Sequence, residues 1–122
     1  MSQKIERFTD LNAWKEAHKF AVKIYQITKG FPKEEQFGLT SQIRRAAVSV
    51  SSNIAEGFSR YNVAEKKNFY RIAKASLVEV ESQLLIARDV GYLNKEIVSE
   101  LFYQAEITGK LLTGLINGVN KR

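Results

Sequence analysis

The side chains best suited to chemistry are few and lie far apart along the chain. His18 is the only histidine, and the chain has no cysteine. A catalytic triad, an HExxH site and a multi-histidine metal centre each need partners that this sequence does not supply. Di-iron sites in helix bundles take Glu-x-x-His pairs from two helices, and one histidine cannot provide them. We therefore expect no metal, no cofactor and no small-molecule substrate.

Two residues remain as candidates for proton transfer, and each has a simpler interpretation. His18 falls on or near the apolar side of its segment, where a histidine is more often a packed core residue than a ligand. Glu56 lies among small and apolar residues. A buried glutamate can act as a base when its pKa is raised, but it is more often a structural hydrogen-bond or ion-pair partner. Phosphate-binding loops of the GxxxxGK[ST] or GxGxxG type are absent. We expect that the protein is not an enzyme.

Positive charge is the feature that most favours a partner. The formal net charge is +6 and the pI is about 9.6, which favours nucleic acid, the ribosome or a membrane surface, with solubility alone as the alternative. The candidate phosphate contacts are Lys15, Lys19, Lys23, Arg44, Arg45, Arg60, Lys66, Lys67, Arg71 and Lys74. Such contacts give affinity without sequence specificity. No RNA-recognition, zinc-finger or helix-turn-helix motif accompanies them.

Four periodic segments must position these side chains. Breaks at Gly30 to Pro32, at Gly57 to Asn62 and at Gly91 to Asn94 separate the segments. They predict helices at about 10–29, 38–58, 63–90 and 95–119, with Asn62 and Asn94 as N-caps. Apolar residues recur at spacings of three and four in each segment, and no alternating strand pattern competes. Short connections between long helices predict an all-α, up-down antiparallel four-helix bundle in one domain, 1–122.

The chain has none of the sequence signals of export or membrane insertion. The first ten residues are polar and mixed in charge, unlike a signal peptide. No stretch approaches the roughly 18 apolar residues that span a bilayer. The lack of cysteine suits a reducing compartment. We therefore expect a cytoplasmic protein with no membrane partner.

A second, polar stripe runs along the predicted helix at 38–58. Its members are Gln42, Arg45, Ser49, Asn53 and Glu56. Arg45 and Glu56 are about 16 Å apart along a helix axis, so they cannot pair within it. A buried member would need a partner from another helix or subunit, because unpaired buried charge is costly. We interpret the stripe as a contact with a neighbouring chain, and a solvated face is the alternative.

Four aromatic residues lie beside the main apolar stripes and would expose apolar surface in a monomer: Phe20, Tyr70, Phe102 and Tyr103.

Residues 37–57 carry a recognisable pattern, FGLTSQIRRAAVSVSSNIAEG. Together with LNAW at 11–14, FP at 31–32 and IAKASLVEVE at 72–81, it closely resembles the four-helix-bundle proteins encoded within intervening sequences of bacterial 23S ribosomal RNA genes. The resemblance covers nearly the whole chain. One position departs from it, since Ala75 stands before Ser76 where the family often has glycine.

The resemblance implies an up-down bundle that assembles into a ring-shaped homopentamer with a central channel. It also implies a relation to the accessory bundle proteins of diversity-generating retroelements, which associate with reverse transcriptase and bind nucleic acid through basic surfaces. Gln42, Arg45, Ser49, Asn53 and Glu56 would be its polar signature positions. Two functions follow as hypotheses. One is a basic, homo-oligomeric accessory protein that binds RNA or associates with the ribosome. The other is an adaptor ring that docks a nucleic-acid enzyme such as a reverse transcriptase.

Overall fold

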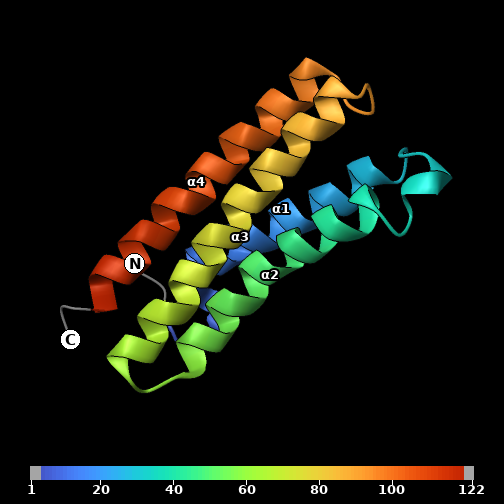
Figure 1. Cartoon of the computed structure of the whole chain (residues 1–122). Coiled ribbons are helices and arrows are strands. Elements are labelled where there is room, and N and C mark those ends of the chain that lie inside the picture. Colours follow the sequence, from blue (N-terminus) through green and yellow to red (C-terminus); the bar gives the residue numbers. More distant parts are fainter. Residues whose placement is uncertain (1–3, 120–122) are drawn as a thin grey trace.

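Four long helices run alternately up and down the molecule in the computed structural model (Figure 1). The structure describes residues 4–119. The helices are α1 (Asn12–Thr28), α2 (Leu39–Ser59), α3 (Val63–Asp89) and α4 (Lys95–Val119), with short 3-10 turns η1 (Phe8–Asp10) and η2 (Lys33–Glu35). Each helix packs on the next in sequence, and α1 also packs on α4, which closes the bundle. The predicted all-α, up-down four-helix bundle is confirmed.

The helix boundaries agree with the predicted ones to within two residues. The largest difference is at the start of α1, because Asp10 ends the preceding 3-10 turn instead of beginning the helix. Its carboxylate accepts hydrogen bonds from the backbone N–H groups of Glu6 and Arg7, each at 3.0 Å. These two bonds hold the pKa of Asp10 below its usual value.

Both predicted N-caps are confirmed. The side-chain oxygen of Asn62 accepts from the backbone N–H of Glu65 at 3.1 Å. The side-chain oxygen of Asn94 accepts from the backbone N–H of Ile97 at 2.9 Å. Each bond satisfies a backbone donor that the first turn of a helix leaves without a partner. At the other end of α3, Gly91 has φ +90, a conformation that favours glycine.

Apolar stripes from all four helices meet in one core. Its largest fully buried side chains include Tyr70, Phe20, Ile24, Ile43, Ile54, Leu84, Leu101 and Leu112. Each contributes about 1.5–3 kcal/mol by leaving water. The prediction that Phe20 and Tyr70 would expose apolar surface is therefore wrong. Phe102 is half-buried, and Tyr103 of the same predicted group is exposed.

Helices α2 and α3 make the most extensive contact of the bundle. A Cβ atom on Gly57 would lie 2.6 Å from Cε1 of Tyr70, so the glycine makes room for the tyrosine ring. With Tyr70 turned inward, Leu77 and Val80 follow it into the core at helical spacing. Ile72, two residues after Tyr70, is 40% exposed. No helix within residues 4–119 is both long and apolar enough to cross a membrane.

Candidate nucleic-acid interface

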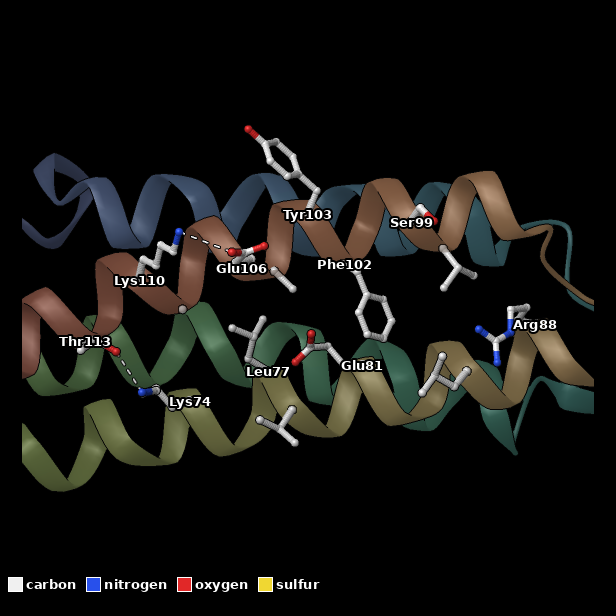
Figure 2. Close-up of a pocket in the computed structure, with 15 residues that line it drawn as sticks. Lys74, Leu77, Glu81, Arg88, Ser99, Phe102, Tyr103, Glu106, Lys110 and Thr113 are labelled. Carbon is white, nitrogen blue, oxygen red and sulfur yellow. Dashed lines mark hydrogen bonds and ion pairs between the residues drawn. The ribbon is translucent and has the colours of Figure 1, made fainter.

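Helix α4 carries an exposed aromatic side chain between two grooves. Tyr103 is 68% exposed, and it lines one groove against α1 and another against α3. It points outward because it lies about 200° around the helix from Leu101, which faces the core. Figure 2 shows Tyr103 directed away from the α3–α4 groove, whereas Phe102 points into it.

The groove between α1 and α4 has a volume of about 550 Å³ and a basic wall. Lys19 and Lys23 line it from α1, one helical turn apart and hence on the same side of the helix. Lys19 forms an exposed ion pair with Glu16 at 3.6 Å, and Glu100 is the acidic residue of the lining. Two of the three cations predicted on the first helix thus lie beside α4. The third, Lys15, is half-buried one turn before them.

His18 lines the same groove, and its predicted burial is wrong. The imidazole is exposed and stacks on the indole of Trp14, with ring centroids 4.7 Å apart and planes at 19°. The indole covers one face of the imidazole, so His18 packs on a neighbour in its own helix instead of in the core. The stacked pair presents a flat surface near Lys19.

The groove between α3 and α4 is larger, at about 850 Å³, and has a cationic end. Lys74 donates to the Thr113 hydroxyl at 2.9 Å, so its stripe on α3 faces α4 (Figure 2). Lys67 and Arg71 lie on that same stripe, seven and three residues before Lys74. From the opposite wall, Lys110 forms an exposed ion pair with Glu106 at 3.4 Å.

We use the term α4 face for the surface formed by these two grooves and by the basic stripe of α3 that continues from Lys74. Its members are Lys19, Lys23, Lys67, Arg71, Lys74, Tyr103 and Lys110. Five of them come from the predicted set of candidate phosphate contacts. Sequence reasoning missed Tyr103 as a site residue and Lys110 altogether. Both side chains lie on the outer side of α4, away from its apolar stripe. An aromatic residue outside that stripe was the one sequence signal that could have indicated Tyr103 as a binding residue.

The middle of the α3–α4 groove is apolar. Leu77, Val78, Leu85 and Phe102 line it, and Val78 is 62% exposed. Glu81 lies among them, half-buried, and burial raises the pKa of its carboxyl group above the ordinary value. The cations therefore stand at the ends of this groove and apolar atoms form its centre.

Other predicted phosphate contacts hold the bundle together. Arg44 donates to the Thr28 hydroxyl at 2.8 Å and packs over the Tyr25 ring at 4.7 Å, which joins α2 to α1. The Lys66 ammonium donates to the carbonyl oxygens of Gly57 and Phe58, at 3.2 and 2.8 Å, and so satisfies the last turn of α2. These bonds give Arg44 and Lys66 structural roles.

Arg60 also makes contacts within the bundle. Its guanidinium pairs with Glu56 at 3.1 Å and lies over the Phe69 ring at 4.8 Å. Arg45, in contrast, is exposed on the surface of α2. Of the three arginines in the predicted set on or just after α2, Arg45 is the one whose side chain points into solvent.

The polar stripe of α2 runs along its contact with α3. The hydroxyl groups of Ser49 and Ser76 are 2.8 Å apart across the two helices. Asn53 donates to the carbonyl oxygen and to the hydroxyl of Ser49, at 2.8 and 2.9 Å. Gln83 is 7% exposed and its side-chain oxygen accepts no hydrogen bond within residues 4–119. We call this strip the α2–α3 seam: Gln42, Arg45, Ser49, Asn53 and Glu56 with Ser76 and Gln83.

Within one chain, Arg45 and Glu56 are not buried, so neither needs a charged partner from another helix or subunit. Arg45, Gln42 and Glu56 are exposed in the single chain. Glu56 has its ion-pair partner, Arg60, one turn away on its own side of α2. The idea that a second chain covers this face remains a hypothesis about the assembled protein.

Metal-ligating groups do not converge anywhere in the described part of the chain. Among residues 4–119, no three His, Cys, Asp or Glu side chains lie close enough to hold a metal ion. Glu79 and Glu81 lie on different sides of α3, one exposed and the other facing the groove.

The fold and surface define the protein's class: a small, basic, antiparallel four-helix bundle with a polar seam on α2. The model of the 23S rRNA-intervening sequence protein family matches residues 9–114, and the chain belongs to that family. A solved structure from Bacteroides thetaiotaomicron, described as a protein of unknown function from the S23 ribosomal protein family, is similar in fold. The two are 24% identical with a TM-score of 0.79, and the match covers 86% of this chain and 95% of the other. A comparison with functionally curated proteins gave no match.

Proposed function

We propose that this protein is a non-enzymatic accessory protein that binds RNA, in the cytoplasm, through its α4 face. The observation that carries the proposal is the arrangement of cations on both sides of one exposed aromatic. Lys19 and Lys23 lie on the α1 side of Tyr103, and Lys74 lies on the α3 side with Lys67 and Arg71 on its stripe. Interleaved basic and aromatic side chains suit a polyanion that also carries flat bases.

The ion pairs already present on this face do not block phosphate. Lys110 and Glu106 have side chains 77% and 63% exposed, and Lys19 is 67% exposed in its pair with Glu16. Exposed pairs of this kind contribute about 0–1 kcal/mol, so a phosphate can displace the carboxylate. The contacts carry no base information, which is consistent with binding by charge and shape. The family's tie to 23S rRNA genes supports ribosomal RNA or the ribosome as the partner.

We also propose that the chain works as a homo-oligomer, a homopentamer by its resemblance to the family. The α2–α3 seam supports this, because its exposed polar members, Gln42, Arg45 and Glu56, form a surface that a second chain could cover. Exposed Arg45 and Ile72 flank the serine pair on the same side of the bundle. Repeating the α4 face around a ring would add weak phosphate contacts through multivalency.

A protein adaptor, for example for a reverse transcriptase, is the second candidate function. The observation that favours it is the apolar centre of the α3–α4 groove, where Val78 is 62% exposed. An apolar helix of another protein would bind there with little salt dependence, whereas phosphate contacts weaken steeply with salt.

The salt dependence of RNA binding separates the two. Fluorescence anisotropy of a labelled ribosomal RNA fragment, measured from low to high salt, should give an affinity that falls with a slope of about 0.7 per phosphate contact. A folded protein that leaves the RNA unbound at low salt would contradict the RNA-binding proposal and favour the adaptor.

A further inference from the structure

The α3–α4 groove has a composition that phosphate contacts alone do not explain. Its ends carry cations, Lys74 and Lys110 on one side and Arg88 on the other, but its centre is lined by Leu77, Val78 and Phe102. Arg88 forms a partly exposed ion pair with Asp89 at 2.8 Å, and a phosphate can compete with this carboxylate as with the other exposed pairs. Lys74 and Arg88 are about 21 Å apart along α3. A nucleic-acid backbone could bind at both ends, but the centre would repel it.

We propose that this groove binds an unpaired base, so that the RNA bound by the α4 face is single-stranded; this rests on the proposed function. Phe102 points into the groove between α3 and α4 (Figure 2). A base stacked on this ring would cover the apolar surface of Val78, while phosphates of the neighbouring nucleotides on either side lie on the cations at the two ends. A volume of about 850 Å³ is ample for one base.

Glu81 adds an element of selection to the groove. Its carboxyl group lies between the two helices beside Leu77 (Figure 2). A carboxylate here repels phosphate from the centre of the groove, and it accepts hydrogen bonds from the exocyclic amino group of a base such as cytosine. Half-burial raises the pKa of Glu81, as expected for a carboxyl group in apolar surroundings.

Double-stranded RNA does not fit this arrangement. In a duplex the base faces are stacked within the helix, and the protein meets phosphates, 2′-hydroxyls and base edges. The groove would then stay empty and its apolar surface would contribute nothing. Aromatic stacking of an unpaired base changes affinity by about 5- to 150-fold, so the preference for single strands should be measurable.

The test compares a fluorescein-labelled single-stranded RNA with the duplex of the same sequence by anisotropy. Wild-type protein should bind the single strand at least about fivefold more tightly. The variant Phe102→Leu keeps an apolar side chain but removes the ring, and it should lose that preference. Gly109→Leu is a second variant. A Cβ there meets only the Leu77 side chain, at the ordinary contact distance of 3.6 Å. A leucine should occupy part of the groove and, like Phe102→Leu, reduce the preference for the single strand.

The outcomes are separable. Equal binding of both RNAs, weakened by loss of Lys19 and Lys23, would overturn the single-strand inference and leave the proposed function intact. Failure to bind either RNA at low salt would contradict the proposed function itself. A 2-aminopurine base in the single strand gives a direct readout, because stacking on Phe102 quenches its fluorescence. Unchanged fluorescence in a bound complex would also overturn the inference.

Discussion

The Tyr92 hydroxyl donates a 2.8 Å hydrogen bond to the Glu35 carboxylate, which ties the loop after α3 to the turn before α2. The other carboxylate oxygen of Glu35 accepts from the backbone N–H of Leu39 at 3.0 Å, in the first turn of α2. The Tyr92 ring also packs on Phe31, with centroids 5.3 Å apart. One carboxylate therefore holds a helix start and two loops together at this end of the bundle.

The contribution of this link should depend on pH. The hydrogen bonds from Leu39 and from Tyr92 hold the pKa of Glu35 below its ordinary value of 4.5. A depressed folded-state pKa means that the stabilisation is present above pH 4.5 and is lost as pH falls through the folded-state value. The hydrogen bond to Glu35, with burial and the carboxylate charge, raises the pKa of Tyr92, so the link persists to above pH 10.

The variant Tyr92→Phe tests this window. We expect it to lower the thermal unfolding midpoint at pH 7 and to have a smaller effect near pH 3, because the stabilisation decreases as the pH falls below 4.5 towards the folded-state pKa of Glu35. Circular dichroism at the two pH values gives the comparison. An equal loss at both would mean that the ring contact with Phe31, not the hydrogen bond to the carboxylate, accounts for the effect.

Gly57 should not tolerate alanine. A Cβ atom there would lie 2.6 Å from the Tyr70 ring, and overpacking of this kind costs about 1–3 kcal/mol. Alanine favours the helix by about 1 kcal/mol relative to glycine, which offsets only part of this cost. We therefore expect urea unfolding to show a lower free energy of unfolding. Gly114→Ala is the matched control, because no atom lies within 4 Å of a Cβ at that position. It should raise the free energy of unfolding, and equal effects of the two exchanges would contradict the packing described.

The adjacent residues Arg44 and Arg45 should behave differently. Arg44→Gln removes a hydrogen bond to Thr28 and a contact with the Tyr25 ring, and should cost about 1 kcal/mol of stability. In the single chain, Arg45→Gln should change stability by less than about 0.5 kcal/mol, because the side chain is exposed there. Chemical denaturation of both variants, each combined with Ile72→Glu to keep the chains apart, provides the measurement. A loss for Arg45→Gln as large as that for Arg44→Gln would contradict this difference.

Self-association should depend on the α2–α3 seam. Ile72 lies one helical turn before Ser76 and is 40% exposed, so Ile72→Glu introduces charge beside the seam without opening the core. We expect light scattering to give a multiple of 13.9 kDa for the wild type and a single chain for this variant. Val63→Glu, at a residue 44% exposed at the start of α3, should keep the wild-type mass. A wild-type mass of one chain would refute the homo-oligomer.

Local signals predicted the fold well. The helix ends at Asn62 and Asn94 depend on residues next to them, and both caps are confirmed. Which side of a helix turned inward was less certain, because a wide apolar stripe allows more than one rotation. Tyr70 entered the core and Ile72 did not, since Gly57 on α2 leaves space for a ring. That space depends on two helices and has no signal within either one.

The candidate site was predictable only in part, for the same reason. Lysines and arginines were visible as charges, but their partners were not. Arg44 and Lys66 bond to atoms on the preceding helix, which gives them structural roles. Tyr103 belongs to the candidate site because α4 packs between α1 and α3, which places basic residues on both sides of its ring. Spacing within one segment cannot give that information.

A contribution of Tyr103 itself should be separable from stability. Its side chain is 68% exposed, so Tyr103→Ala should leave the unfolding midpoint nearly unchanged. It should weaken RNA binding about fivefold or more if a base stacks on the ring. Anisotropy at one salt concentration is sufficient. Unchanged RNA affinity would mean that no base stacks on Tyr103.

The most direct test of the central claim is RNA affinity as a function of salt for two charge-matched double variants. Lys19→Gln with Lys23→Gln removes two cations from the α4 face, and Lys33→Gln with Lys95→Gln removes two exposed lysines elsewhere. Both lower the formal net charge of +6 by two. We predict that the first variant loses affinity and about 0.7 of salt slope per contact, and that the second stays near wild type. Equal losses in both variants, or none in either, would contradict an RNA-binding site on the α4 face.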